Sequence, residues 1–253
     1  MDLQLAGKRA LITGGSKGIG RATAEVLAEE GMDILLVSRS ADVLEETANS
    51  IRRTRQVQVE TLAADLSQES EVLRLAQHAG EIDVLVNNAG AIPPGTLLSV
   101  DNDTWRRAWD LKVFGFISFC RQLYPHMAAR KSGVIVNVIG AAGEKFPPGY
   151  IAGAAGNASL MAFTRALGHG SQKDGIRVVG INPGATETER QTMLLRHRAQ
   201  TELGDANRYP ELLANNPFGR IATPHEIGYA VAFLASPRSG YTTGTILTID
   251  GGA

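Results

Sequence analysis

The chain has 253 residues, one cysteine and a formal net charge of −1, with 25 basic and 26 acidic residues. Since single α/β domains reach ~250 residues, this length predicts one domain spanning residues 1–253. The balanced charge gives no electrostatic reason to bind nucleic acid or an anionic membrane, and no run of ~18 apolar residues predicts a membrane span. The lone Cys120 excludes an internal disulfide and favours a reducing compartment, so we expect a cytoplasmic protein.

Short apolar runs alternate with longer segments of helical periodicity. The runs predict seven strands: Arg9–Thr13, Asp33–Ser38, Val57–Leu62, Ile82–Asn87, Gly133–Val138, Arg177–Asn182 and Thr245–Ile249. Their polarity does not alternate, which is typical of a parallel sheet covered on both faces. Helices are predicted over Gly18–Glu30 and Asp103–Arg130, the second with Asp101 and Asp103 as candidate N-caps. The pattern predicts a doubly wound α/β fold, a Rossmann-type three-layer sandwich with a mostly parallel seven-stranded sheet.

Glycine is the compositional excess, because 28 glycines are about half as many again as the average ~7%. The segment Thr13-Gly14-Gly15-Ser16-Lys17-Gly18-Ile19-Gly20 follows the first predicted strand and begins the first helix. Glycines there permit a sharp turn and let backbone N–H groups approach a pyrophosphate, while the helix N-terminus adds partial positive charge. A glycine-rich turn without a ligand is the alternative, but the strand before and the helix after favour binding.

The spacing Gly14-x-x-x-Gly18-x-Gly20 resembles the cofactor signature of the short-chain dehydrogenase/reductase family. The resemblance covers essentially the whole chain through four further motifs: Asp65-Leu66, Asn87-Asn88-Ala89-Gly90, Asn182-Pro183-Gly184 with Thr186 and Thr188, and Asp250-Gly251-Gly252. It implies an oxidoreductase that transfers hydride between nicotinamide and a small carbonyl or alcohol substrate, in a homodimer or homotetramer. It implies these cofactor-binding residues: Gly14, Ser16, Lys17, Gly18, Ile19, Gly20, Ser38, Arg39, Asp65, Leu66, Asn88, Ala89, Gly90, Pro183, Gly184, Thr186 and Thr188.

The end of the second predicted strand, Val37-Ser38-Arg39, indicates which cofactor is used. An acidic side chain there would bond both ribose hydroxyls of NAD, and none is present. Arg39 can instead pair with a 2′-phosphate, and Lys17 would add charge on the same side. The sequence therefore favours NADP(H) over NAD(H), the alternative being that both are solvated cations.

The four catalytic residues that the resemblance implies, an Asn, a Ser, a Tyr and a Lys four residues after the Tyr, are missing. In the register anchored on Asn137-Val138 and Leu160–Leu167, their positions hold Lys112, Gly140, Gly153 and Asn157. A shifted register does not restore them, because none of the five tyrosines has a lysine four residues on.

Two explanations remain open. In the first, the acid/base system is rebuilt: Tyr150, three residues before Gly153, fills the space that this glycine vacates, and Lys112 supplies an ammonium from a facing helix. In the second, the site is not a dehydrogenase site: the protein is a catalytically silent nucleotide-binding or ligand-sensing relative, or it performs a different reaction that needs no phenol as proton donor. Tyr150 as a rim aromatic and Lys112 as a surface lysine are the structural alternatives. The small residues 152–156 also suit close helix packing.

The segment 187–217 is predicted to be the substrate lid. Its cations would suit an anionic substrate such as a carboxylate or an acyl thioester, although solvated helix charges are the alternative: Arg190, Arg196, His197, Arg198 and Arg208. The histidines show no metal-ligand spacing, so we expect no metal. Cys120 falls on an apolar helix face and is predicted to be a small buried hydrophobe.

Overall fold

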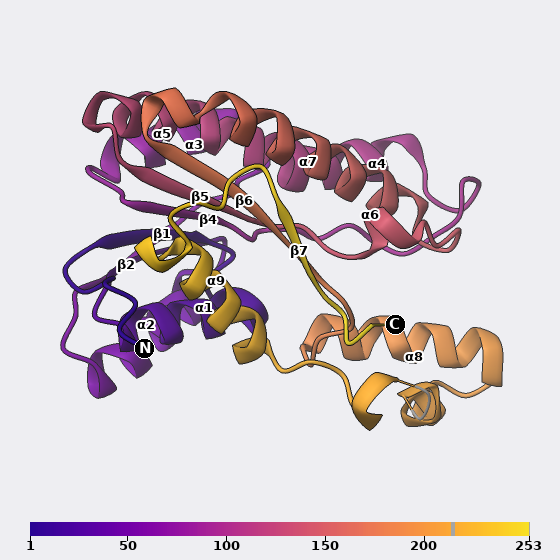
Figure 1. Cartoon of the computed structure of the whole chain (residues 1–253). Coiled ribbons are helices and arrows are strands. Elements are labelled where there is room, and N and C mark those ends of the chain that lie inside the picture. The colour runs from indigo at the N-terminus through magenta and orange to yellow at the C-terminus, as the bar shows by residue number, and fades with distance from the viewer. Residues whose placement is uncertain (214–215, 253) are drawn as a thin grey trace.

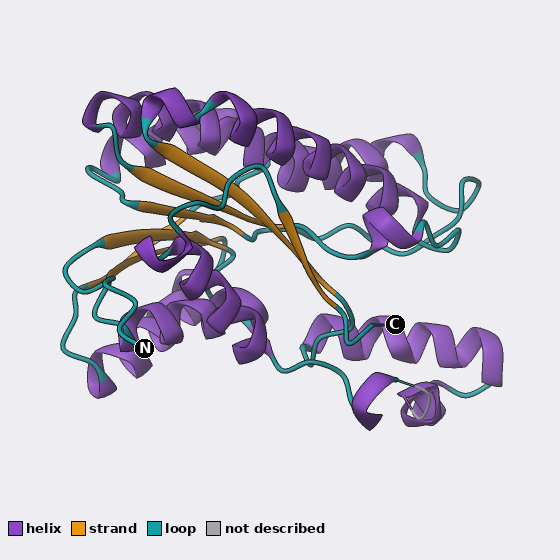
Figure 2. Cartoon of the chain, viewed as in Figure 1, coloured by secondary structure: helices purple, strands orange, loops and turns teal. Residues whose placement is uncertain are grey.

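Seven strands form one sheet at the centre of the computed structural model, which describes residues 1–213 and 216–252 (Figures 1 and 2). They are β1 (Arg9–Thr13), β2 (Asp33–Ser38), β3 (Val59–Ala63), β4 (Val84–Asn87), β5 (Gly133–Val138), β6 (Ile176–Pro183) and β7 (Ile246–Ile249). Their order is β3-β2-β1-β4-β5-β6-β7, and every pairing between them is parallel. The predicted Rossmann-type sandwich is confirmed, with a sheet that is wholly parallel in the described residues.

Helices cover both faces of the sheet. On one face lie α1 (Gly18–Glu29), α2 (Ala41–Thr54) and α9 (Pro224–Ala235), drawn below the strands in Figure 1. On the other lie α3 (Glu69–His78), α4 (Asn102–Trp109), α5 (Gly115–Arg130) and α7 (Ile151–Gly170), with the short α6 (Ala142–Lys145) at one end. Short helical turns complete the chain: η1 (Asp110–Phe114), η2 (Gln172–Asp174), η3 (Ala206–Leu213), η4 (Pro217–Gly219) and η5 (Pro237–Ser239).

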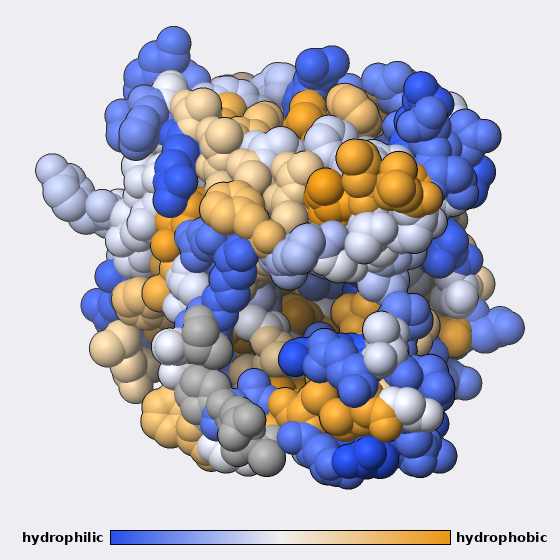
Figure 3. All heavy atoms as spheres, turned by 90° about the vertical axis from the view of Figure 1, so that its right-hand side faces the viewer, coloured by the Kyte–Doolittle hydropathy of each residue, from blue (hydrophilic) through white to orange (hydrophobic). Residues whose placement is uncertain are grey.

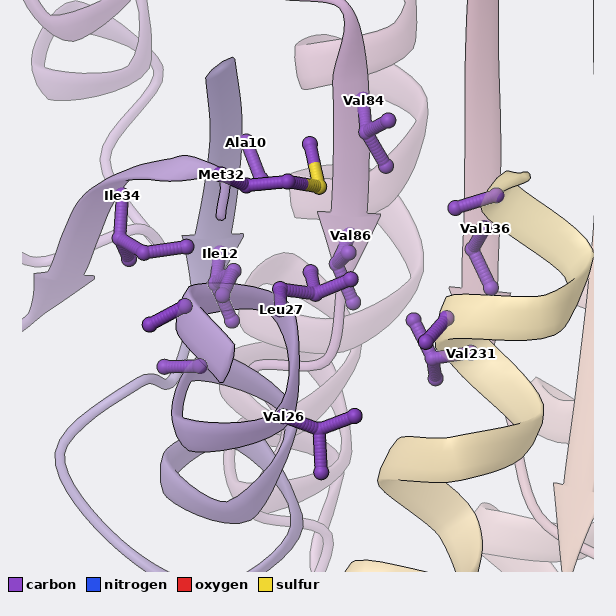
Figure 4. Close-up of a cluster of buried hydrophobic side chains, with 14 of the residues drawn as sticks. Ala10, Ile12, Val26, Leu27, Met32, Ile34, Val84, Val86, Val136 and Val231 are labelled. Atoms are coloured by element: carbon purple, nitrogen blue, oxygen red, sulfur yellow. The ribbon is translucent and has the colours of Figure 1, made fainter. Parts of the chain in front are cut away.

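Both faces of each central strand are buried, which explains why the apolar runs do not alternate. Along β1, Ile12 packs toward α1 and α9 while its neighbour Leu11 packs toward α3 and α5. Figure 4 shows the first of these clusters, in which Leu27 of α1 lies beside Val86 of β4 and Val231 of α9 lies beside Val136 of β5. Because successive strand residues point to opposite faces, a strand covered twice must be apolar throughout.

The predicted helix Asp103–Arg130 is interrupted. Asp101 is its N-cap, with a carboxylate that accepts a hydrogen bond from Thr104 N at 2.7 Å, whereas Asp103 lies in the first turn and caps nothing. After Trp109 the backbone widens into the π-helical turn η1 before α5 begins. Such turns often occur at functional sites, and this one carries Lys112.

The predicted lid forms a separate layer at the carboxyl end of β6. It consists of α8 (Glu189–Leu203) packed against η3, followed by η4, and it lies apart from the helices that cover the sheet (Figure 1). Residues 214–215 of the predicted lid, and residue 253, lie outside the described residues. Among the described helices, none is long and apolar enough to cross a membrane.

Candidate functional site

A cavity of about 1310 Å³ lies at the carboxyl ends of the strands. It is bounded by the glycine loop, the segments after β4 and β5, and the lid helix α8. Figure 3 views the molecule from the side on which α6 and α8 lie, where the surface is hollowed between an upper and a lower part. This is the edge at which doubly wound sheets bind ligands.

The glycine loop is clamped to the segment after β4. Thr13 Oγ1 accepts hydrogen bonds from Asn88 N at 2.9 Å and from Ala89 N at 3.0 Å. In return, Asn88 Nδ2 donates to Thr13 O at 3.0 Å and to Gly14 O at 3.3 Å. These bonds hold together two segments far apart in the sequence, and residues of both segments line the cavity.

Glycine is required in this loop for two reasons. Gly14 and Gly18 have φ values of +68° and +54°, a region that side chains disfavour. A Cβ on Gly20 would lie 2.2 Å from Gly14 O, so the helix and the loop approach more closely than any side chain permits. The loop therefore presents bare backbone, as a pyrophosphate site demands.

The residues predicted to bind the cofactor divide into two groups. Twelve line the cavity: Gly14, Ser16, Lys17, Gly18, Ile19, Asn88, Ala89, Gly90, Pro183, Gly184, Thr186 and Thr188. The others do not line it: Gly20, Ser38, Arg39, Asp65 and Leu66. Gly20 and Leu66 are buried, Gly20 against the backbone of Gly14 and Leu66 in the hydrophobic core.

The predicted adenine end of the site is open to solvent. Arg39 is exposed and has no hydrogen bond or ion pair within the described part of the chain. Asp65 is exposed too, and its carboxylate accepts hydrogen bonds from Ser67 N and Ser67 Oγ at 3.1 and 2.8 Å. Lys17 differs from the expectation, because its ammonium pairs with Glu189 of the lid at 2.9 Å and its charge is compensated.

Tyr150 is the N-cap residue of α7 rather than a residue within the helix. Its ring lies where a side chain on Gly153 would be, with Tyr150 Cε1 2.0 Å from the position of a Cβ on that glycine. The hydroxyl accepts a hydrogen bond from Arg190 Nη2 at 3.2 Å. Arg190 also donates to the backbone carbonyl of Ile92, so the lid reaches across the cavity to Tyr150.

Lys112 projects from η1 into the same cavity. Its ammonium donates to Ile139 O at 2.6 Å, and its stem lies against Gly90. Burial, with a further contribution from the nearby Arg190, lowers the pKa of Lys112 to about 7. The surface-lysine alternative therefore does not describe Lys112.

Gly140 and Asn157, which stand at two of the expected catalytic positions, are joined by a hydrogen bond. Gly140 has a φ of +131°, and its carbonyl accepts a hydrogen bond from Asn157 Nδ2 at 3.2 Å. Asn157 is buried, and its Oδ1 has no hydrogen-bond partner within the described residues. A buried acceptor beside a cavity is costly unless a ligand supplies the donor.

Most cations of the lid do not face the cavity as an anion site would require. Arg198 pairs with Glu202 at 2.7 Å and Arg208 with Glu211 at 2.8 Å, while the Arg196 guanidinium lies over the Tyr209 ring. The predicted basic surface is thus largely compensated on the helix itself. Arg190 and Arg198 both line the cavity, but of the two only Arg190 has no carboxylate partner within the described residues.

Sequence reasoning missed a buried polar network that joins the ends of β4 and β5. Asn87 Nδ2 donates to Asn137 Oδ1 at 2.9 Å, and Asn137 Nδ2 donates to Thr164 Oγ1 at 2.9 Å. Cys120 lies at its end, is buried as expected, and has a pKa raised by burial to about 12. The only signal was two asparagines that end predicted apolar strands. The small residues of α7 pack on the end of α4 and on η1, and Trp109 Nε1 at the end of α4 donates to Ala152 O at 3.0 Å.

The parallel sheet and the clamped glycine loop at the head of a long cavity define a dinucleotide-binding α/β protein. The chain belongs to the short-chain dehydrogenase family, whose sequence model, "short chain dehydrogenase", matches residues 8–199. Members of this family are NAD(P)-dependent oxidoreductases that act on carbonyl or alcohol substrates. The chain is therefore an oxidoreductase of this family.

Relatives align with the chain over its whole length. The 3-oxoacyl-(acyl-carrier-protein) reductase FabG of Chlamydia muridarum is 31% identical, covering 100% of this chain and 99% of that protein. Cis-4-hydroxycyclohexanecarboxylate dehydrogenase of Sinomonas cyclohexanicum is 35% identical, covering 100% and 98%. Among solved structures, L-sorbose reductase of Gluconobacter frateurii, complexed with NADPH and L-sorbose, superposes with a TM-score of 0.92 at 32% identity, covering 99% and 98%.

Proposed function

We propose that the chain is an NADP(H)-dependent oxidoreductase with a rebuilt active site, in which Tyr150 is the general acid and base. The observation that carries this proposal is the ring of Tyr150 lying in the space beside Gly153. In the register of the family, Gly153 stands where the catalytic tyrosine is expected. A phenol is therefore supplied from three residues earlier, at the start of the same helix.

The residues present fit a nicotinamide dinucleotide. The glycine loop is a cradle that a side chain on Gly20 would fill, and its backbone can hold the pyrophosphate. At the other end, the unpartnered Oδ1 of Asn157 is an acceptor suited to a ribose hydroxyl. When bound, the cofactor supplies a hydride to the carbonyl carbon, or takes one from the alcohol.

The hydroxyl of Tyr150 is arranged to donate its proton to the substrate. Because Arg190 donates to the oxygen of Tyr150, the O–H proton must point elsewhere, and Tyr150 is one of the residues that line the cavity. In reduction, Tyr150 transfers this proton to the carbonyl oxygen as negative charge develops on that oxygen. A proton from solvent water then restores the phenol. Arg190 is a positioning residue, since it acts by holding the tyrosine.

The test replaces Tyr150 by phenylalanine. Removing the proton donor should lower kcat/KM for carbonyl reduction by roughly 10²–10⁴, the usual contribution of general acid catalysis. NADPH binding, followed by fluorescence, should persist because the glycine loop is untouched. The matched control is Tyr241→Phe, a fully exposed tyrosine. Full activity in Tyr150→Phe would overturn the proposal.

The silent nucleotide-binding protein remains the second candidate. What favours it is the missing tyrosine–lysine pair, together with the glycines at the catalytic positions. It predicts saturable NADPH binding without turnover across panels of ketones, oxo acids and alcohols. Turnover of any panel member that disappears in Tyr150→Phe excludes it.

The preference for NADP(H) is tested at Arg39. If its exposed guanidinium pairs with the 2′-phosphate, Arg39→Ala should raise the Kd of NADPH roughly 10- to 100-fold, because a charged hydrogen bond contributes about 1.5–3 kcal/mol. The Kd of NADH should change little, since NADH lacks that phosphate. Parallel titrations of both cofactors measure this, and an equal loss of affinity for both would contradict it.

A cytoplasmic location and assembly as a homodimer or homotetramer stay predictions.

A further inference from the structure

We propose that the substrate carries a carboxylate, which binds between Lys112 and Arg190 beside Tyr150. The proposal rests on the proposed function, because it names the substrate class of the same site. It differs from the expectation of a basic lid surface, since it depends on two side chains inside the cavity.

The two cations come from different elements and meet at one residue. The stem of Lys112, from η1, lies so close to Gly90 that a Cβ there would be 2.7 Å from Lys112 Cδ. Arg190, from α8, has its Nη1 3.5 Å from Gly90 O on the same segment. Both line the cavity, and Arg190 is bonded to the Tyr150 hydroxyl. An anion held here lies within reach of the proposed proton donor.

Neither cation has a counterion within the described part of the chain. Elsewhere around the cavity the cations are compensated: Lys17 pairs with Glu189 at 2.9 Å, and Lys145 pairs with Asp250 at 2.8 Å. Among the described residues, the Lys112 ammonium contacts Ile139 O and the Phe116 ring, and the charged group that acts on it is the second cation, Arg190, not a carboxylate. Two unpaired cations side by side repel each other, and this cost is relieved by a bound anion.

The position of the pair favours a substrate carboxylate over a phosphate of the cofactor. The phosphate-binding backbone is at the glycine loop and the N-terminus of α1, where Gly18 begins the helix. Arg190 instead contacts the tyrosine at the start of α7. Both ligands offer the same anionic chemistry, so the experiment must separate them.

Lys112 makes the proposal testable through pH. Burial and the neighbouring Arg190 lower its pKa to about 7, so it is charged below that pH and neutral above it. Binding of a carboxylate to the charged form should weaken as pH rises through 7. A bound carboxylate favours the ammonium, so the pKa of Lys112 rises in the complex.

The experiment compares oxo acids with their own methyl esters. For each pair, kcat/KM is measured between pH 6 and 9 with NADPH, for the intact chain, Lys112→Met and Lys112→Arg. The acid should be preferred over the ester by at least about tenfold at pH 6, and the preference should fall above pH 7. Lys112→Met should remove the preference and its pH dependence, and Lys112→Arg should restore the preference without the pH dependence. Because Tyr150 acts on both compounds, its own contribution cancels in the ratio.

Three results would overturn the proposal: equal kcat/KM for acid and ester in the intact chain, an equal loss for both in Lys112→Met, or a raised Kd for NADPH in that variant. The last would assign the cations to the cofactor. Turnover of esters that depends on Tyr150, without any preference for acids, would leave the proposed function standing while this inference fails. If no compound is turned over, binding of acid and ester to the NADPH complex, read by fluorescence, still decides the inference.

Discussion

Replacing Gly153 by alanine should abolish nearly all carbonyl reduction while leaving the fold intact. The new Cβ would lie 2.0 Å from Tyr150 Cε1 and 2.1 Å from Cζ, so the ring must leave its place. The loss should reach or exceed the roughly 10²–10⁴ expected for Tyr150→Phe, because the whole ring moves rather than its hydroxyl alone. Steady-state kcat/KM with NADPH measures it.

The stability of this variant should not fall, which separates the effect from unfolding. The three atoms nearest to the new Cβ all belong to the ring of one partly exposed side chain and none to the backbone, and alanine is about 1 kcal/mol better than glycine within a helix. Gly170→Ala is the matched control, because this glycine belongs to the same helix and a Cβ there meets nothing within 4 Å. A Gly153→Ala enzyme as active as Gly170→Ala would show that the position of the ring is not needed for catalysis.

The second large effect is expected at Gly20, where alanine should weaken cofactor binding. A Cβ there would lie 2.2 Å from Gly14 O and 2.6 Å from Asn88 Nδ2. Unlike the ring of Tyr150, a backbone carbonyl cannot swing aside, so the loop itself must shift. Overpacking of this kind costs about 1–3 kcal/mol, and the clamp between Gly14 and Asn88 should be lost with it.

Titration with NADPH should show the Kd raised by roughly 10- to 100-fold, on the scale of 1.4 kcal/mol per tenfold. Thermal unfolding without cofactor should show a lower Tm than the intact chain. Gly170→Ala again serves as the control for adding one methyl group to a helix. Unchanged affinity for NADPH in Gly20→Ala would mean that the loop does not hold the cofactor.

The local patterns of the sequence were enough to predict the fold. A strand covered on both faces has to be apolar at every position. The runs around Leu11 and Leu35 meet this requirement within a few consecutive residues, so the strands could be predicted. The glycine loop could be predicted from the sequence as well, because the positive φ values at Gly14 and Gly18 favour glycine at those two positions. The predicted bounds of an element were less exact where packing with distant residues sets its course. The predicted helix that is interrupted by η1 is an example.

The arrangement of the candidate active site was only partly predictable. That no tyrosine has a lysine four residues on is a property of the sequence, and it directed attention to Tyr150 and Lys112. The inward turn of Arg190, its bond to Tyr150, and the pairing of Lys17 with Glu189 were not predicted. These contacts link α8 to residues distant in the sequence, so they depend on where α8 lies relative to the sheet.

The sequence by itself determined that this protein is a parallel α/β sandwich with bare backbone at the end of its first strand, because burial and backbone sterics act on neighbouring residues. Tertiary structure decided the chemistry of the cavity. Only the packed chain brings the Tyr150 ring beside Gly153 and sets two cations, Lys112 and Arg190, against Gly90. Those contacts follow from the path of the loops and the lid, which no local pattern records.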